Sequence, residues 1–255
     1  MIFMKILLYI AFLGTNYCGY QIQPNGITVQ QRLNEAAAAL FGFDCDIVGC
    51  SRTDSGVHAN CFCATVAKKG TGELNTSIPV DRIPLALANY LPNDISVFKA
   101  TAVENDFHPR YDVKYKEYVY RIWNRRERDP FMFDRAWHYT KLIDDATLEK
   151  MNDAARRFIG THDFAAYMAS DTKIKDTVRT IYDAEVTRQG DIVEFRVSAN
   201  GFLYNMVRIL TGTLISVAEG KISPNDIDGI TLSRDRRRSG ITVPPEGLYL
   251  NKVIY

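Results

Sequence analysis

The spacing of apolar positions changes repeatedly along the chain, and each spacing predicts a strand or a helix. In the first part of the sequence, short alternating or continuous apolar runs predict strands at residues 6–12, 45–50, 58–67 and 95–103. A helix follows the capping residues Thr28 and Gln31 and stops at Gly42. Its apolar stripe comprises Val29, Leu33, Ala36, Ala37 and Leu40. A shorter helix is predicted after Asp81, with a buried face made of Ile83, Leu87, Tyr90 and Leu91.

This order of strand, helix, strand, strand, helix, strand is that of a ferredoxin-like unit, in which both helices cover one face of an antiparallel sheet. The rest of the chain repeats the order. It has predicted strands at 117–123, 180–187, 192–199 and 247–254, a helix from Asp144 or Asp145 to Ile159 that ends at Gly160, and a helix at 202–218.

The repeated order predicts an α+β fold. Two ferredoxin-like βαββαβ units would join into one extended, mainly antiparallel sheet with helices on one face, which leaves the other face free for an extended ligand. We place the junction near residue 104, so that residues 1–104 form an N-terminal half and residues 105–255 a C-terminal half. No sequence repeat accompanies the pattern, so the duplication is inferred from architecture alone.

Composition restricts the class of protein. A chain of 255 residues with 46% hydrophobic content can bury one large core or two small ones. No apolar run reaches the roughly 18 to 20 residues of a membrane-spanning helix, so we expect a soluble protein without a membrane partner. The five cysteines are odd in number and lie in the first quarter of the chain, which favours a reducing cytoplasm over a secreted disulfide framework.

The net charge alone does not suggest a nucleic-acid partner. It is +1, whereas a nucleic-acid-binding domain usually has a pI above about 9. The distribution of charge is more informative, because arginines gather in two clusters. These are Arg121, Arg125, Arg126 and Arg128, and Arg234, Arg236, Arg237 and Arg238. For either cluster taken alone, a solvated surface is the favoured interpretation.

The segment 49–59 carries the candidate chemistry. It is polar, although it lies between two apolar predicted strands. A simple hairpin needs only turn-forming residues such as Asp54, Ser55 and Gly56, and in that interpretation Asp54 bonds its own backbone. However, Arg52, Asp54 and His58 lie within seven residues on a loop held by two strands, and such a compact set of charges is typical of an active site.

The segment Arg52-Thr53-Asp54-Ser55-Gly56-Val57-His58-Ala59 resembles the signature of the TruA family of tRNA pseudouridine synthases. Further segments match in family order over nearly the whole chain. They include Gly19-Tyr20-Gln21, Thr28-Val29-Gln30, Phe107-His108-Pro109-Arg110, Tyr118-Val119-Tyr120, Gly160-Thr161-His162-Asp163-Phe164, Val178-Arg179-Thr180-Ile181, Gly201-Phe202-Leu203-Tyr204-Asn205-Met206-Val207-Arg208 and Pro244-Pro245-Glu246-Gly247-Leu248-Tyr249-Leu250. Ile22, Pro109 and Val243 depart from the family pattern, but none of them removes a group with chemical function.

The resemblance implies the roles of individual residues. Asp54 would be the catalytic nucleophile, Arg208 its cationic partner, and Tyr118 the aromatic residue that packs on the target base. Since Asp54 stands in the first half and Arg208 in the second, the fold would have a catalytic cleft between the halves. Arg52 would assist base flipping. Arg110, His58 and the arginine clusters would be candidates for contacts with the RNA backbone. The resemblance also implies a homodimer, no cofactor and no metal, and a tRNA substrate modified at positions 38 to 40 of the anticodon stem-loop.

The chemistry itself favours an ionised carboxylate. Isomerising uridine breaks a carbon–nitrogen glycosidic bond and rejoins the uracil through carbon, without exchanging electrons with a cofactor. A carboxylate can attack the ribose carbon, as in retaining glycosidases, or add to the uracil ring, and the sequence leaves both routes open. A water-excluding site would raise the pKa of Asp54 unless a cation compensates, and a buried arginine at 208 would in turn need a carboxylate.

Two other functions remain as alternatives. A zinc-binding module could use Cys45, Cys50, Cys61 and Cys63 near His58, although their spacing is not that of paired CxxC sites. A non-catalytic RNA-binding protein could use the ferredoxin-like sheet as a platform, but it would have no use for Asp54.

Overall fold

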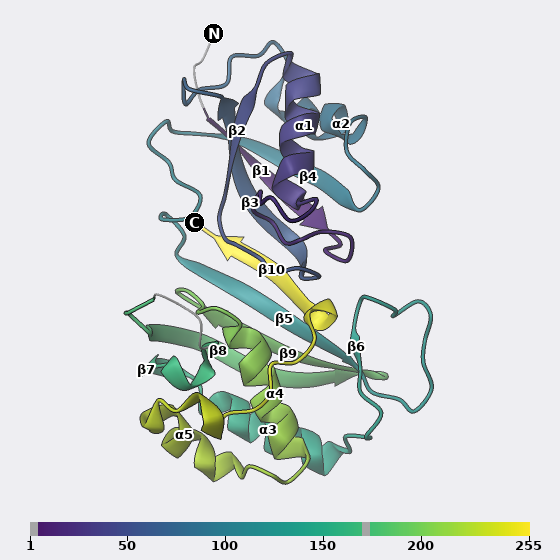
Figure 1. Cartoon of the computed structure of the whole chain (residues 1–255), viewed down its shortest axis with the longest axis vertical. Coiled ribbons are helices and arrows are strands. Elements are labelled where there is room, and N and C mark those ends of the chain that lie inside the picture. The colour runs from purple at the N-terminus through teal and green to yellow at the C-terminus, as the bar shows by residue number, and fades with distance from the viewer. Residues whose placement is uncertain (1–4, 170–173) are drawn as a thin grey trace. The chain divides into compact units, whose positions relative to one another are not determined.

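The computed structural model describes residues 5–169 and 174–255 and has an α+β fold (Figure 1). These residues form ten strands and five α-helices, and neighbouring strands pair mostly in the antiparallel direction. The predicted fold class is therefore confirmed. None of the helices in the described ranges has the length and apolar character needed to cross a membrane.

The chain divides into two compact units. Unit 1 runs up to Lys114 and includes Leu250–Tyr255, whereas unit 2 comprises Tyr115–Tyr249. The predicted junction near residue 104 lies at the end of a strand, but the chain after it still belongs to unit 1. Residues 105–114 belong to unit 1 because they bond its C-terminal residues. The Lys114 N–H donates to the Ile254 carbonyl at 2.8 Å, and the Tyr255 hydroxyl donates to the Pro109 carbonyl, also at 2.8 Å.

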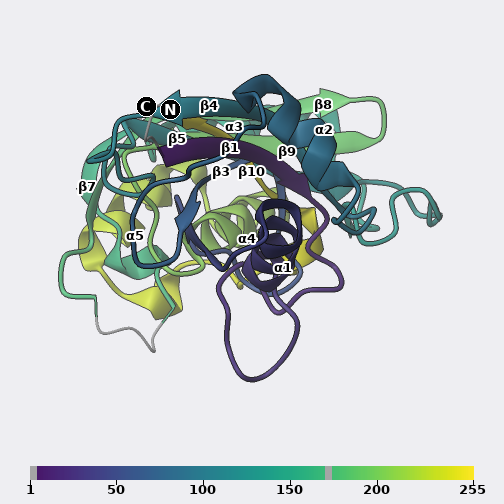
Figure 2. The ribbon, with the colours of Figure 1, turned by 90° about the horizontal axis from the view of Figure 1, so that it is seen from above.

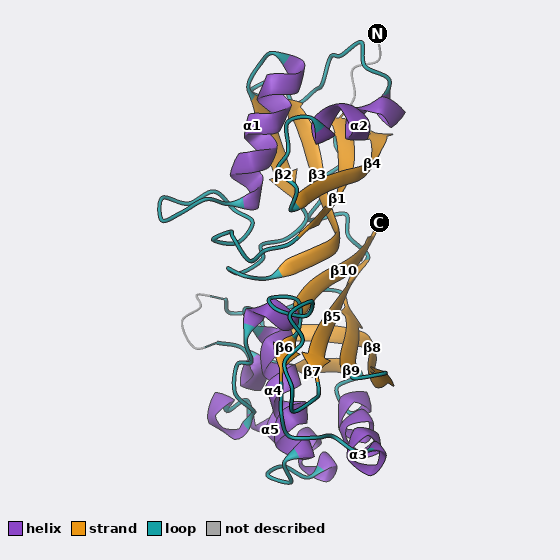
Figure 3. Ribbon diagram, turned by 90° about the vertical axis from the view of Figure 1, so that its right-hand side faces the viewer, coloured by secondary structure: helices purple, strands orange, loops and turns teal. Residues whose placement is uncertain are grey.

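Unit 1 has the predicted order of elements. They are β1 (Lys5–Phe12), α1 (Val29–Phe41), β2 (Cys45–Gly49), β3 (His58–Lys68), α2 (Ile83–Ala88) and β4 (Ile95–Val103). The strands are ordered β4-β1-β3, and β2 pairs with one end of β3. Helices α1 and α2 contact each other and lie on the same side of these strands (Figure 3). This arrangement is that of a ferredoxin-like unit.

Helix α1 has the boundaries that the sequence predicts. The Thr28 side chain accepts a hydrogen bond from the Gln31 N–H, and Gly42 ends the helix in the left-handed conformation with φ 76°. Helix α2 ends at Ala88, before the last two residues of its predicted buried face, Tyr90 and Leu91. Of its predicted buried face, Ile83 and Leu87 are buried, but Tyr90 lies beyond the helix and is 50% exposed.

Unit 2 repeats the order with additions. Its elements are β5 (Tyr115–Trp123), β6 (Trp137–His138), α3 (Asp145–Arg156), β7 (Gly160–Asp163), β8 (Val178–Gln189), β9 (Ile192–Ala199), α4 (Met206–Ala218), α5 (Ile227–Ser233) and the start of β10 (Leu248–Ile254). The strands are ordered β5-β9-β8-β7. Helices α3, α4 and α5 lie on one side of β8 and β9 (Figure 1), and Figure 2 shows the β8–β9 hairpin from above.

Two helix boundaries in unit 2 differ from the prediction. Helix α3 ends at Arg156 rather than Ile159, because the next three N–H groups bond carbonyls three residues back, and Gly160 opens β7 instead of capping the helix. Helix α4 begins at Met206 rather than residue 202, because Asn205 adopts a left-handed conformation with φ 59°. The sequence analysis also missed β6, β7 and α5, which are short.

Candidate active site

Asp54 lies in unit 1 on the loop between β2 and β3. The Val57 N–H donates to the Asp54 carbonyl at 3.2 Å, and Gly56 has a φ of 78°, so the predicted turn is present. The Asp54 side chain is half-buried, whereas its neighbours Thr53 and Val57 are buried. The turn and a chemical role for Asp54 are therefore compatible, because the turn bond uses the main chain of Asp54.

His58, the first residue of β3, is fully buried. Its Nδ1 accepts a hydrogen bond from the main-chain N–H of Gly14 at 2.8 Å. From the sequence, His58 is a candidate for contact with the RNA backbone, but a ring with no exposed surface offers little to a phosphate. The contact with Gly14 points instead to a role in holding the loop.

The other two predicted residues of unit 1 are accessible. Arg52, two residues before Asp54, and Arg110 are both exposed. The Arg110 main chain is fixed by a hydrogen bond to Nδ1 of His108 at 3.2 Å, and the His108 ring stacks on Tyr111 with centroids 4.2 Å apart. Both guanidinium groups can therefore reach a ligand in solvent, as contacts with an RNA backbone require.

Tyr118 lies in unit 2 on β5, opposite Val197 of β9. Its side chain is 7% exposed, and its ring meets the ring of Phe202 edge to face, with centroids 4.9 Å apart. Edge-to-face contact fixes the plane of a ring. Tyr118 is therefore an oriented aromatic residue with little exposed surface.

Arg208 lies in the first turn of α4 and is half-buried. Its Nε donates to the Val243 carbonyl at 2.7 Å, and a terminal nitrogen donates to Oδ1 of Asn205 at 2.8 Å. Burial raises the pKa of Glu246, and the charge of Arg208 opposes this rise. The guanidinium thus has fixed neutral acceptors and a carboxylate within electrostatic range in unit 2.

Asn205 and Glu246 are residues that the sequence analysis did not single out. Both stand in segments that match the family, but the sequence gives no signal that Asn205 turns left-handed or that its amide holds Arg208. Val243 contributes its main chain alone, so its departure from the family pattern leaves the contact with Arg208 in place.

The arginine clusters are largely engaged within unit 2. In the first cluster, Arg121 pairs with Glu194 at 3.2 Å and Arg125 with Asp191 at 3.3 Å, while Arg126 and Arg128 are exposed. In the second, Arg234 pairs with Asp163 at 2.9 Å. These ion pairs favour the interpretation of both clusters as ordinary surface, because a paired guanidinium has less charge to offer a phosphate.

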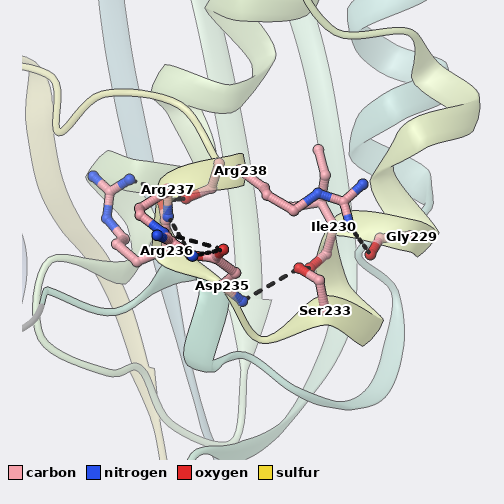
Figure 4. Close-up of polar contacts among 8 residues, drawn as sticks. Gly229, Ile230, Ser233, Asp235, Arg236, Arg237 and Arg238 are labelled. Atoms are coloured by element: carbon pink, nitrogen blue, oxygen red, sulfur yellow. Dashed lines mark hydrogen bonds and ion pairs between the residues drawn. The ribbon is translucent and has the colours of Figure 1, made fainter.

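Figure 4 shows how the second cluster is held. Arg237 is turned toward Asp235, which it contacts at 2.8 Å, and Arg238 reaches the Gly229 carbonyl at 3.4 Å. Arg236 is half-buried and bonds three acceptors on the following segment, namely Ser239, Gly240 and Thr242. Arg236 therefore stabilises a loop.

The cysteines do not form the zinc site considered above. Cys45 begins β2 opposite Lys68, whereas Cys50 follows the other end of β2. The main-chain N–H of Cys50 donates to the carbonyl of Cys63 at 2.8 Å. None of the five cysteines, all of which lie in the described ranges, is part of a disulfide. Within residues 5–169 and 174–255, no group of three or more His, Cys, Asp or Glu side chains is arranged to hold a metal ion.

The protein is of the α+β class and consists of two units with ferredoxin-like strand order. Unit 1 presents a half-buried aspartate, Asp54, on its β2–β3 loop. The family model described as tRNA pseudouridine synthase matches residues 8–112 and 154–255. This match includes Asp54 and Arg208 but not Tyr118. The chain belongs to the tRNA pseudouridine synthase family, and the resemblance stated from the sequence is confirmed.

Relatives match over almost the full length. The tRNA pseudouridine synthase A of Acetivibrio thermocellus is 44% identical over 98% of this chain and 99% of its own. That of Thermoanaerobacter sp. is 42% identical with the same coverage, and that of Clostridium acetobutylicum is 40% identical over 95% of this chain and 96% of its own. Among solved structures, a chain from a crystal structure of a Cbf5-Nop10-Gar1 complex has a TM-score of 0.38 and 13% identity, covering 96% of this chain and 48% of that one, a level that establishes no relationship by itself.

Proposed function

We propose that this protein isomerises uridine to pseudouridine in tRNA, at positions 38 to 40 of the anticodon stem-loop, with Asp54 as the reactive carboxylate. The observation that carries the proposal is the Asp54 loop. In a chain of this family, a half-buried aspartate stands on a short turn that neighbouring main-chain atoms hold in place. Such a loop can present a carboxylate to a substrate with little conformational freedom to lose.

The reaction balances without an external redox partner. The bond between ribose C1′ and uracil N1 breaks, and a bond between C1′ and uracil C5 forms. C5 loses its proton to water, and N1 takes up a proton from water. Asp54 attacks either C1′ or the uracil ring, and the covalent bond it forms is broken when pseudouridine is released. Both routes need the ionised carboxylate.

Arg208 is suited to the role of the supporting cation. An arginine keeps its charge at any physiological pH, and its planar group can hold several oxygen acceptors in fixed directions. The contacts to Val243 and Asn205 fix the guanidinium before any substrate arrives. We propose that it favours the ionised form of the catalytic carboxylate.

Tyr118 and Arg52 complete the proposed machinery. The target base must leave its stack, at a cost of a few kcal/mol, before a carboxylate can reach the sugar. Arg52 is exposed close to Asp54 in sequence and would occupy the vacated space or hold a phosphate. Tyr118 would stack on the extruded uracil, a contact of about 1 to 3 kcal/mol that leaves the base able to turn in its plane. Arg110 would contact the RNA backbone.

We further propose that the protein acts in the cytoplasm as a homodimer with one tRNA spanning both subunits. Five cysteines that form no disulfide within the described ranges are in keeping with a reducing compartment. A dimer would also bring the exposed Arg52 and Arg110 of two chains to one RNA, which would offset the net charge of only +1 per chain.

Tritium release tests the function. Transfer RNA labelled at uracil C5 is incubated with the purified protein in the presence of EDTA, and modified positions are then mapped by reverse transcription after carbodiimide treatment. We expect tritium in the water and stops at positions 38 to 40. Tight tRNA binding without any release of tritium would instead identify a non-catalytic RNA-binding protein.

A further inference from the structure

The loop between β1 and α1 contacts the Asp54 loop along its length, within unit 1. At one end, the Gly14 N–H donates to Nδ1 of His58 at 2.8 Å. In the middle, the Ser55 hydroxyl donates to the Tyr17 carbonyl at 3.1 Å. At the other end, the Tyr20 N–H donates to the Thr53 carbonyl at 3.3 Å. These bonds bracket Asp54 on both sides.

Two glycines make this close approach possible. A Cβ atom on Gly14 would lie 2.0 Å from the carbonyl oxygen of Val57, and one on Gly19 would lie 2.3 Å from the carbonyl oxygen of Thr53. Both obstacles are main-chain atoms of the Asp54 loop, so a side chain could be accommodated only by moving that loop. Gly19 also has a φ of +77°, which disfavours any other residue.

The Gly14–His58 bond is buried and directional. His58 is fully buried, and its Nδ1 must lack a proton to accept from a main-chain N–H. An apolar side chain in its place would leave the buried N–H of Gly14 without this acceptor. The ring thus links the start of β3 to the β1–α1 loop.

The β1–α1 loop is itself fixed at its base. The Tyr17 hydroxyl donates to Oδ1 of Asp94 at 2.6 Å, and the Leu13 N–H donates to the Asp94 carbonyl at 2.9 Å. Burial, followed by this hydrogen bond to Asp94, raises the pKa of Tyr17, so the hydroxyl keeps the proton that it donates. At the other end, the Val29 N–H at the start of α1 bonds the Gly19 carbonyl at 3.2 Å.

We propose that the segment 14–20 is a clasp that sets the position of the Asp54 carboxylate, with Gly14, Gly19 and His58 as positioning residues. The clasp touches the main chain on either side of Asp54 and is itself bonded to Asp94, the residue before β4, and to the first residue of α1. Its role in the reaction rests on the proposed function. Displacing a reacting group by about 1 Å can reduce a rate about 100-fold, so the clasp acts on the chemical step rather than on tRNA affinity.

The test compares four substituted proteins with wild type. Gly14→Ala pushes on Val57, and His58→Leu removes the acceptor, whereas His58→Asn places an amide oxygen near the position of Nδ1. Gly70→Ala is the control, because Gly70 has a φ of +79° but open space around it, so its replacement strains the backbone without touching the Asp54 loop. The readouts are the single-turnover rate of tritium release, the Kd for tRNA, and hydrogen exchange of the amides in residues 53–58.

We expect Gly14→Ala and His58→Leu to lower the single-turnover rate about 100-fold with the Kd for tRNA unchanged, and His58→Asn to recover most of the rate. Amide exchange in residues 53–58 should accelerate in the first two and stay at the wild-type level in Gly70→Ala. The clasp is wrong if Gly14→Ala and His58→Leu keep the wild-type rate, or lose no more of it than Gly70→Ala does.

Ser55→Ala keeps the test decisive if the buried substitutions do not fold. Ser55 is exposed, and losing its bond to Tyr17 should lower the rate about 3-fold and accelerate the same exchange. A wild-type rate together with wild-type exchange in this protein would contradict the clasp. If wild type itself released no tritium, the proposed function would fail, while the exchange measurements would still test whether the clasp holds the loop.

Discussion

Arg208 donates through Nε to the main-chain carbonyl of Val243 at 2.7 Å, and this bond joins the first turn of α4 to the segment that leads into β10. The Val243 N–H returns a bond to the Arg208 carbonyl at 3.5 Å. Together with the contact to Asn205, these bonds fix the plane of the guanidinium. A lysine could supply the charge at this position but not the planar geometry.

Arg208→Lys should therefore lower the single-turnover rate about 100-fold, because the cation would no longer be held in one orientation. The rate and the melting temperature should be measured on the same preparation. Arg32→Lys, in the exposed pair of Arg32 with Glu35 at 2.8 Å, is the matched control and should leave both unchanged. Equal rates for Arg208→Lys and wild type would remove Arg208 from the catalytic machinery.

Asn205→Gly separates orientation of Arg208 from stability. Glycine adopts the left-handed φ of 59° more easily than asparagine, so the free energy of unfolding should change by less than about 1 kcal/mol. The acceptor for the Arg208 terminal nitrogen is lost, and the single-turnover rate should fall about 10-fold. If Asn205→Gly lowered stability and rate in parallel, Asn205 would be only a structural residue.

Glu219 in unit 2 gives a prediction about pH. Hydrogen bonds from Lys141 at 2.6 Å and Lys221 at 2.5 Å, with the Tyr139 hydroxyl at 3.0 Å, lower the pKa of its carboxyl from 4.5 to about 2. Because the folded pKa lies below the unfolded one, the stabilisation is complete above pH 4.5 and is lost as the pH falls toward 2.

Glu219→Gln should consequently cost about 1 kcal/mol of unfolding free energy at pH 7, a modest value because both lysines are largely exposed and screened by solvent. Denaturant titrations of the two proteins should converge as the pH is lowered from 5 to 2. A constant difference across that range would show that the ion pairs are not its cause.

Cys61 should react faster than Cys45. A hydrogen bond with Cys63 lowers the pKa of the Cys61 thiol, although partial burial opposes the change, whereas burial raises the pKa of Cys45 to about 11. The thiolate is the nucleophile, so Cys61 should be alkylated faster than Cys45 at neutral pH. Mass spectrometry after iodoacetamide treatment should find Cys61 labelled before Cys45, and Cys61→Ser should remove the corresponding labelled peptide. Preferential labelling of Cys45 would contradict this order.

The sequence predicted those parts of the fold that depend on local signals. Thr28 and Gly42 mark the ends of α1 because a cap and a left-handed glycine act within a few residues. Gly160 looks like the same signal after α3, but the chain has already left the helix at Arg156, and only the pairing of β7 with β8 explains its position. Such long-range pairing leaves no local trace in the sequence.

In the candidate site, too, local sequence signals reveal some residues, whereas the roles of others depend on the folded structure. Asp54 stands out because a polar loop interrupts two apolar strands. His58 was grouped with the ligand-contacting residues because its charge type suggested it, and the sequence could not reveal that the ring is enclosed and bonded to Gly14. The amide of Asn205 also stayed hidden, since its role depends on a left-handed conformation that the sequence does not specify.

The most direct measurement is the single-turnover release of tritium from C5-labelled tRNA by Asp54→Asn, with the Kd for tRNA determined in parallel. Asp81→Asn, an exposed substitution of the same kind in unit 1, serves as control. If Asp54 is the reactive carboxylate, its amide should lower the rate by at least about 1000-fold while tRNA binding and the melting temperature stay at wild-type values. Release at the wild-type rate by Asp54→Asn would contradict the proposed chemistry.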